Sequence, residues 1–296
     1  MKRDFLKLSD LSLGELNALF ERTKELKALR KARKVVTTLQ GRTLVLVFEK
    51  SSTRTRLSFE AAMAQLGGHA IVLPVADSQL SRGESVADTA RVMSGYADAI
   101  MLRTFEDARL AEFARHASVP LINGLTDGGH PVQLLADLFT LIEKFGKLEG
   151  LKVAFVGDGS SNMGHSWVEA ADLFRIDLRI ASPEGYRPKG SVKAFSPQDA
   201  VKGVDVVATD VWTSMGQEKE KAARLAAFKG YIVDASLMSL AAPHAVVLHC
   251  LPAHRGEEIT DDVLEGPKSV VWAEAENRMH VQKALLEKLI LEGQSS

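Results

Sequence analysis

The 296-residue chain is poor in features that mark several classes of protein. A single cysteine, Cys250, excludes an internal disulfide framework and a zinc site built from several cysteines, and it is typical of a reducing cytoplasm. The formal net charge of -1 gives no basic field for nonspecific nucleic-acid binding. No apolar run approaches a membrane span, and the N-terminus lacks the apolar core of a secretory signal. We therefore expect a cytoplasmic enzyme with no nucleic-acid or membrane partner.

Short apolar runs that favour strands alternate with stretches whose apolar spacing suits helices. Helices are expected at 13–34 after a Ser9-Asp10 cap, at 131–145, and from about 275 to 291. This alternation predicts an α/β fold of doubly wound parallel sheets covered by helices on both faces. The chain is long for one core, so we expect two domains with a break near 146–150. The expected strands are 43–48, 70–73, 99–102, 120–123, 151–156, 177–181, 204–209, 231–234, 246–248 and 269–272.

The most informative stretch, residues 49–60, joins the first strand to the next helix. It places three hydroxyl side chains and two arginines where a helix begins, in the run Ser52, Thr53, Arg54, Thr55 and Arg56. Free backbone N–H groups and the positive end of the helix dipole meet there, so the corner can bind a phosphate. An N-cap alone requires one hydroxyl, so we favour the phosphate receptor over simple capping.

Polar residues also follow the strands expected at 99–102 and 120–123. Arg103 follows 99–102 and adds another basic group. His130 stands directly before Pro131, in an N-cap position that disfavours an imidazolium, so a neutral His130 can donate a hydrogen bond to a carbonyl. Gln133 lies on the same helical face. Taken alone, a capping histidine and a surface glutamine are the better explanation of this pair.

Three further clusters follow strands of the second half. The glycines of 157–164 do not fit the dinucleotide-binding spacing, so a nicotinamide-linked dehydrogenase is a poor candidate, and Asn162 is free to bind a polar organic group. Asp210 is placed to receive an amine, and the loop after it carries Ser214 and Met215. Cys250 follows another strand, where a buried thiol and a nucleophile both remain open.

Together these motifs resemble the aspartate/ornithine carbamoyltransferase family. The resemblance rests on Ser52-Thr-Arg-Thr-Arg56, His130-Pro-Val-Gln133, Asp210 with Ser214-Met-Gly216, and His249-Cys-Leu-Pro252, and it extends from about residue 5 to 289. The last two motifs are similar to the ornithine branch. The resemblance implies a homotrimer with shared active sites that makes citrulline for arginine biosynthesis, without a cofactor or a metal. It also implies a carbamoyl phosphate-binding domain over 1–146, an ornithine-binding domain over 147–274, and a C-terminal helix over 275–296 that packs back on the first domain, joined by interdomain helices.

The resemblance implies a role for each matched residue. Arg54, Arg103, His130, Asp210 and Cys250 would be catalytic. Ornithine would be held by Asn162, Asp210, Ser214 and Met215. Gln79 would reach into the neighbouring subunit's site. Carbamoyl phosphate would be held by Ser52, Thr53, Arg54, Thr55, Gln79, Arg103, His130, Gln133, Cys250, Leu251 and Arg278.

Two departures and two alternatives accompany this interpretation. The segment 186–204 is short for the family, and Arg82 stands near a position where the aspartate branch has a functional lysine, although an exposed arginine is the simpler interpretation. One alternative function is a transferase acting on an acylated ornithine or another amine. The other is a non-catalytic homologue, which should have lost some of Arg54, Arg103, His130 or Cys250, and all four are present.

Overall fold

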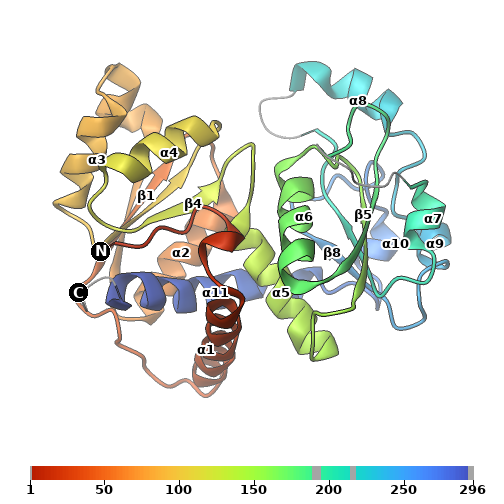
Figure 1. Ribbon diagram of the computed structural model, residues 1–296, viewed down its shortest axis with the longest axis horizontal. Coiled ribbons are helices and arrows are strands. Elements are labelled where there is room, and N and C mark those ends of the chain that lie inside the picture. Colours follow the sequence, from red (N-terminus) through yellow and green to blue (C-terminus); the bar gives the residue numbers. More distant parts are fainter. Residues whose placement is uncertain (1, 189–194, 214–217, 293–296) are drawn as a thin grey trace. The chain divides into compact units, whose positions relative to one another are not determined.

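Two compact units make up the chain in the computed structural model, which describes residues 2–188, 195–213 and 218–292 (Figure 1). Unit 1 comprises Met1–Ala136 and Asn277–Ser296, and unit 2 comprises Asp137–Glu276. Each unit holds one four-stranded sheet in which all strands are parallel. The predicted α/β fold with parallel sheets is therefore confirmed, while the predicted domain limits stay predictions.

The sheet of unit 1 has the strand order β2-β1-β3-β4. Register brings Phe48 of β1 beside Arg103 of β3, so the carboxyl ends of these two central strands lie together. The chain leaves β1 toward one edge and β3 toward the other, which makes this junction the topological switch point where open α/β sheets bind ligands. The strands are β1 (Thr43–Phe48), β2 (His69–Pro74), β3 (Ala99–Arg103) and β4 (Leu121–Leu125).

Helices cover both faces of this sheet. Val45, Val47 and Ile100 form one apolar cluster with residues of α3 and α4. Because side chains alternate along a strand, Leu44, Leu46 and Met101 belong to the other face, where Figure 1 shows α2 and α11. The helices with residues in unit 1 are α1 (Leu13–Lys31), α2 (Thr53–Gln65), α3 (Val86–Ser94), α4 (Asp107–His116), the start of α5 (Pro131–Phe145) and most of α11 (Val271–Glu292), with 3-10 turns η1 (Leu8–Asp10), η2 (Val75–Asp77) and η3 (Gln79–Arg82).

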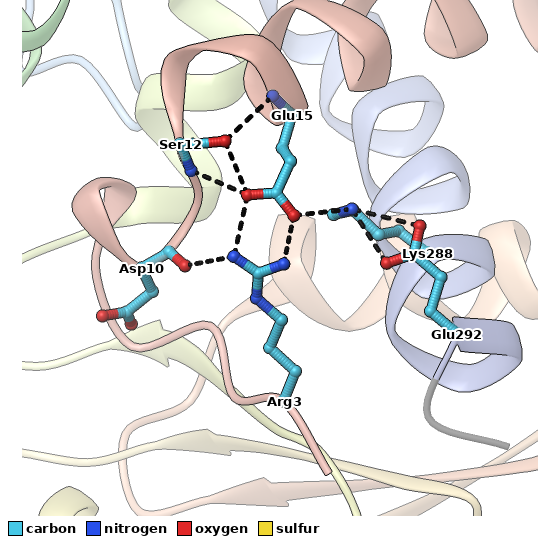
Figure 2. A network of polar contacts seen from close by, with 6 residues as sticks. All are labelled: Arg3, Asp10, Ser12, Glu15, Lys288 and Glu292. Carbon is cyan, nitrogen blue, oxygen red and sulfur yellow. Dashed lines mark hydrogen bonds and ion pairs between the residues drawn. The ribbon is translucent and has the colours of Figure 1, made fainter. Parts of the chain in front are cut away.

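The N-terminal segment is tied to α1 and α11 by one polar network (Figure 2). The Arg3 guanidinium binds the Glu15 carboxylate, with Nη2 2.8 Å from Oε2, and Lys288 of α11 lies 3.2 Å from Oε1 of the same carboxylate. The hydrogen bond from Arg3 is the main reason that the pKa of Glu15 lies far below its usual range. Ser12 and Glu15 also form a capping box at the start of α1, so the cap is Ser12 and the expected cap at Ser9-Asp10 was wrong.

The sheet of unit 2 repeats the same topology, with the order β6-β5-β7-β8 and a switch point between β5 and β7. Val156, Val207 and Val247 form one apolar cluster with residues of α7, α9 and α10, and Figure 1 shows α6 on the opposite face. The elements of unit 2 are β5 (Lys152–Val156), α6 (Asn162–Phe174), β6 (Asp177–Ala181), α7 (Pro197–Val201), β7 (Val206–Thr209), η4 (Glu218–Glu220), α8 (Lys221–Ala227), α9 (Ala235–Met238), β8 (Val246–His249) and α10 (Asp261–Leu264).

Two expected strands were wrong. Val233 in the segment 231–234 makes one isolated bridge with Ile259, and the Asp234 side chain then caps α9 by accepting the Leu237 N–H at 2.7 Å. Ser269 makes one bridge with Val247, and α11 begins at Val271, about one turn before the expected start. Each segment buries one residue, Val233 or Val271, and Trp272 is exposed. A short apolar run does not distinguish a strand from the approach to a helix.

The segment 186–204 lies in the connection between β6 and β7, at the edge of the unit 2 sheet, since β6 is its outermost strand. Among the described residues of this connection the one helix is α7, which has five residues and a Ser196 cap that accepts the Asp199 N–H at 3.1 Å. That the segment is short for the family stays a prediction.

Candidate functional site

The corner between β1 and α2 is a helix N-terminus at the switch point of the unit 1 sheet. Ser52 is the N-cap of α2, and its Oγ accepts the Thr55 N–H at 3.3 Å. Thr55 is buried, Arg54 is half-buried and Thr53 is exposed. Arg56 is exposed and pairs with Glu60 one turn later, so it belongs to the helix surface. The corner thus presents one guanidinium and one buried hydroxyl at the positive end of the helix dipole.

Arg278 of α11 joins this corner to α5. Its Nη2 donates to Oγ1 of Thr55 at 2.8 Å, and its Nη1 donates to Oε1 of Gln133. The side chain is 3% exposed. A planar guanidinium can serve two acceptors at once in a fixed geometry, so Arg278 fixes the positions of Thr55 and Gln133. The structure therefore brings together Thr55, Gln133 and Arg278, which are separated widely in the sequence.

His130 lies buried among the arginines of unit 1. Its carbonyl accepts the Leu134 N–H at 3.2 Å, as expected for the residue that precedes α5. Burial lowers the pKa of His130 well below its ordinary value, and the positive charges of Arg278, Arg103 and Arg54 lower it further. The imidazole is therefore neutral at physiological pH. Every charged group that shifts this pKa is a guanidinium, so the surroundings of His130 form a positive receptor for an anion.

Arg103 completes this group at the end of β3. It is 8% exposed and its register partners are Phe48 on β1 and Leu125 on β4. Its position between the two strands places a buried cation at the switch point itself. The arrangement of unit 1 can hold a phosphate with guanidiniums and, through neutral His130, donate a hydrogen bond to an uncharged oxygen.

In unit 2, Asp210 and Cys250 face each other from the ends of neighbouring strands. Sγ of Cys250 donates to Oδ1 of Asp210 at 3.0 Å, and the Val211 N–H donates to the same oxygen at 2.8 Å. Burial raises the pKa of Asp210. Burial, followed by the negative charge of Asp210, raises the pKa of Cys250 well above its ordinary value. The thiol therefore stays protonated and acts as a hydrogen-bond donor, which argues against the nucleophile left open by the sequence.

The polypeptide around Cys250 is fixed by a buried network that the sequence analysis missed. Nε2 of His249 lies 3.0 Å from Oε1 of Glu258, and Nδ1 of His249 accepts the Leu251 N–H at 2.9 Å. The His249 N–H donates to Oε2 of Glu274 at 3.0 Å. These bonds assign the proton of the neutral ring to Nε2 and hold Leu251 in the left-handed region with φ of 57°. The Leu251–Pro252 bond is cis. Two adjacent glutamates, at 257 and 258, are typical of a solvent-exposed segment. No signal in the sequence therefore indicates that Glu258 is buried.

A second missed group is the ion pair of Asp158 and Arg224. Nη1 of Arg224 is 2.7 Å from Oδ2 of Asp158 and 3.0 Å from the carbonyl of Trp212, and both charged side chains are buried. Asp158 also accepts from Oγ of Ser160 at 2.6 Å. The pair therefore fixes the turn after β5 and the segment after Asp210.

Asn162, the candidate at the start of α6, is half-buried at the first helical position. The glycines on either side of Asn162 meet packing needs, because a Cβ on Gly164 would clash with the backbone of Gly159. The Gly159 N–H donates to Oγ of Ser182 at 3.0 Å, and Ser182 donates to the Gly157 carbonyl at 2.7 Å. This loop thus uses its polar groups internally, in keeping with the rejection of a dinucleotide site.

The remaining candidates take varied positions. Gln79 is exposed on η3, and Arg82 is exposed at the end of the same turn. Leu251 is half-buried beside Cys250. Ser214 and Met215 lie outside the described residues.

Among the described residues, two donor sets have the composition of a metal site, and one of them includes the candidate residues of unit 2. The donor atoms of Asp210, His249 and Cys250 lie within 4.8 Å of one another, and Zn²⁺ accepts this combination of oxygen, nitrogen and sulfur. Both ring nitrogens of His249 are already used by Glu258 and Leu251, and the raised pKa of Cys250 disfavours the thiolate that a metal requires. The set therefore fits a substrate amine better than a metal ion.

Two parallel α/β units with polar residues at the ends of their central strands define an enzyme of the class that binds small molecules at sheet switch points. The sequence pattern described as "Aspartate/ornithine carbamoyltransferase, carbamoyl-P binding domain" matches residues 3–143, and the pattern described as "Asp/Orn binding domain" of the same family matches residues 149–289. The chain therefore belongs to the aspartate/ornithine carbamoyltransferase family.

Individual relatives are similar over almost their whole length. The ornithine carbamoyltransferase of Geobacter metallireducens is 54% identical, over 98% of this chain and 100% of that protein. The anabolic ornithine carbamoyltransferase of Pseudomonas aeruginosa is 53% identical, over 97% of each. The solved structure of ornithine carbamoyltransferase from Pyrococcus furiosus superposes with a TM-score of 0.92 at 47% identity, covering 96% of both chains. None of the helices in the described part of the chain has the length and apolar character needed to cross a membrane.

Proposed function

We propose that the chain transfers the carbamoyl group of carbamoyl phosphate to the δ-amino group of L-ornithine, forming L-citrulline and phosphate. The observation that carries the proposal is the set of three guanidiniums, Arg54, Arg103 and Arg278, whose charges act on the buried, neutral His130. Cations alone would be enough to bind a phosphate. A neutral imidazole among the three guanidiniums can donate a hydrogen bond to an uncharged oxygen, which suits a ligand that carries both a phosphate and a carbonyl. Family membership and the names of the relatives support the same reaction.

Unit 1 binds carbamoyl phosphate in this proposal. Ser52, Thr53, Arg54 and Thr55 hold the phosphate at the start of α2, where the helix dipole and backbone N–H groups favour a dianion. Arg103, His130 and Gln133 bind the carbamoyl end, with Arg278 positioned by its bonds to Thr55 and Gln133. Cys250 and Leu251 are assigned to the same ligand on the resemblance to the family.

Charge on the carbonyl oxygen is stabilised by the same residues. Attack on the carbamoyl carbon turns the carbonyl oxygen into an oxyanion, and Arg103, neutral His130 and the Thr55 hydroxyl supply donors to it. One such donor contributes about 2.7–4 kcal/mol in other enzymes. A neutral His130 is suited to this role because one of its ring nitrogens already carries a hydrogen that it can donate. The imidazole therefore needs no further protonation before the reaction.

Unit 2 binds ornithine through Asn162, Asp210, Ser214 and Met215. The δ-ammonium of ornithine must lose a proton before attack, because most of it is protonated near neutral pH. The Cys250 thiol donates a hydrogen bond to the Asp210 carboxylate, which opposes the rise in its pKa that burial causes and orients it toward an amine. The nitrogen lone pair then forms the new C–N bond while the C–O bond to phosphate breaks. The departing phosphate keeps that electron pair, accepts the amine's proton, and is stabilised by Arg54 and Arg278.

Assembly and pathway complete the proposal. A homotrimer is proposed, in which exposed Gln79 on η3 reaches a neighbouring subunit's ligand. The enzyme works in the cytoplasm and serves arginine biosynthesis, in keeping with the anabolic relative. The domain limits proposed are 1–146 for carbamoyl phosphate, 147–274 for ornithine and 275–296 for the C-terminal helix.

The test is a citrulline-formation assay with carbamoyl phosphate and a panel of amines that includes ornithine, acetylornithine and aspartate. We expect turnover with ornithine, its abolition by Arg54→Gln, and little effect of the matched Arg56→Gln change, because Arg56 is exposed and paired with Glu60. Activity with acetylornithine or aspartate but not ornithine would contradict the acceptor. Nearly full turnover of Arg54→Gln would contradict the phosphate receptor.

A further inference from the structure

A basic pocket of about 670 Å³ lies in unit 1 at the C-terminal ends of α1 and α2, with α11 forming part of its wall. Five cationic side chains line it, namely Arg30, Lys31, Arg33, Lys34 and Lys283, and its lining includes no aspartate or glutamate. It lies apart from the phosphate receptor proposed above, because that receptor is at the first residue of α2 and the pocket is at the last. A helix of the 13 residues of α2 is about 20 Å long.

Four of the cations are exposed and come from the end of α1 and the segment after it. Among the residues that the structure describes, the side chains of Arg30, Lys31, Arg33 and Lys34 form no ion pair with a carboxylate. Arg33 adopts the left-handed conformation with φ of 54°, which glycine favours, and the Lys34 N–H donates to the Leu29 carbonyl at 2.9 Å. The turn that ends the helix thus adds two cations to those of the last helical turn.

Lys283 is the fifth cation and is 2% exposed. Its Nζ lies 3.2 Å from Oε1 of Gln65 and 3.5 Å from the Leu26 carbonyl. Burial, followed by the positive charge of Arg30, lowers the pKa of Lys283 to about 8, while Glu287 opposes the shift. The buried ammonium of Lys283 lies near Arg30 and has no carboxylate of the described residues in hydrogen-bond contact. A bound anion would therefore offset the cost of burying this charge and the repulsion between Lys283 and Arg30.

Helix capping explains only part of this arrangement. Cations in the last turn favour the negative end of the helix dipole, which accounts for Arg30 and Lys31. It does not account for Arg33 and Lys34 beyond the helix, or for a buried lysine that reaches the same pocket from α11. Convergence of three chain segments on one concave, positive surface is the pattern of an anion site.

We propose that this pocket binds a small polyphosphate anion. Several phosphates are required to match five cations, and the chemistry is shared by inorganic tripolyphosphate and the phosphate chain of a nucleoside triphosphate. Val35 and Val36 add an apolar wall next to the cations. The inference does not depend on the proposed transferase reaction, since the pocket's lining includes none of its proposed site residues.

The experiment is calorimetric titration of the full chain carrying Arg54→Gln, which removes phosphate binding at the start of α2. We expect one tripolyphosphate per chain, bound more weakly as salt rises. Lys31→Gln with Lys34→Gln should weaken binding by about tenfold or more. Lys24→Gln with Lys147→Gln changes the net charge equally at exposed positions outside the pocket and should change binding less than about twofold. The pocket variant in the otherwise native chain should keep its citrulline formation, which separates this proposal from the reaction.

ATP in place of tripolyphosphate distinguishes the source of the anion. Equal affinity assigns recognition to the phosphate chain alone, and tighter ATP binding adds contact of the nucleoside with the valines. Lys283→Met, checked for folding by circular dichroism, should weaken binding and remove the proton uptake that accompanies it near pH 8. The groups facing Lys283 are Arg30 from α1, Gln65 from α2 and Glu287 from its own helix. We assign the proton uptake near pH 8 to Lys283, because its pKa is about 8.

Absence of binding to the Arg54→Gln chain, or equal binding by the pocket and control variants, would overturn the proposal. Binding of duplex oligonucleotides or anionic vesicles without binding of either small polyphosphate would also overturn it. If Lys283→Met fails to fold, the double lysine variant on the exposed rim still decides the outcome.

Discussion

Replacing Arg278 by lysine tests whether binding in unit 1 depends on the shape of this side chain or only on its charge. The guanidinium is buried and serves Thr55 through Nη2 and Gln133 through Nη1. An ammonium keeps the positive charge but lacks the planar fork, so one of these two acceptors loses its donor.

The magnitude follows from that lost bond. A hydrogen bond from a charged donor contributes about 1.5–3 kcal/mol, and leaving a buried acceptor unpaired costs about 1–3 kcal/mol. We therefore expect Arg278→Lys to lower the free energy of unfolding by about 1–3 kcal/mol. Because the same guanidinium is proposed to contact carbamoyl phosphate, KM for that substrate should rise about 10- to 100-fold. KM for ornithine should change little, because its proposed residues belong to unit 2.

The assay is steady-state citrulline formation with carbamoyl phosphate varied at saturating ornithine, together with urea unfolding followed by circular dichroism. Arg56→Lys is the matched control, since its side chain is 53% exposed and its ion pair lies on the helix surface. A double-mutant cycle with Thr55→Val should give a coupling energy of about 1–3 kcal/mol. An unchanged KM for carbamoyl phosphate, or equal increases for both substrates, would refute the assignment of Arg278 to the phosphate-binding unit.

Three further changes probe the two units. Cys250→Ser keeps a hydrogen-bond donor to Asp210 and should retain most activity. Cys250→Ala removes the donor and should raise KM for ornithine about tenfold. A similar KM for ornithine in both variants would contradict the donor role of Cys250. Glu15→Gln removes the partner of Arg3 and should cost about 1 kcal/mol of unfolding free energy at pH 7. Because the folded pKa of Glu15 is depressed, this cost should begin to shrink as pH falls below about 4, the pKa of a glutamate in the unfolded chain, and should vanish only below the folded pKa. A cost that does not depend on pH would disprove the ion pair's role. The folded pKa of His130 is also depressed, so below about pH 6.5 the unfolded chain binds a proton that the folded chain does not. The free energy of unfolding should therefore fall by about 1.4 kcal/mol for each pH unit below that value. Urea unfolding of His130→Gln should show this dependence on pH reduced by the contribution of one proton.

The sheet could be predicted where a strand is a continuous apolar run bounded by polar residues. The segments 43–48 and 177–181 were predicted with the limits of β1 and β6. The segments 231–234 and 269–272 were mistaken for strands because they are equally apolar, although each makes a single bridge. Whether an apolar run forms a strand depends on the neighbouring strands with which it can pair, and composition does not reveal those neighbours.

The candidate site was accessible to sequence reasoning where a local signal existed. A run of hydroxyls and an arginine between a strand and a helix marks the start of α2, and His130 before Pro131 marks the start of α5. The bonds of Arg278 to Thr55 and of Arg224 to Asp158 cross 223 and 66 residues respectively, so no spacing rule indicates them. Such pairs depend on the packing of helices that are distant in the sequence.

The protonated state of Cys250 also makes the native chain a convenient background for site-specific labelling. Maleimides and peroxides react with thiolates, and burial together with Asp210 disfavours the thiolate of this residue. No other cysteine occurs in the sequence. A cysteine introduced at an exposed position of either unit, such as Lys24 or Lys229, should therefore react much faster than the native thiol and carry a single fluorophore.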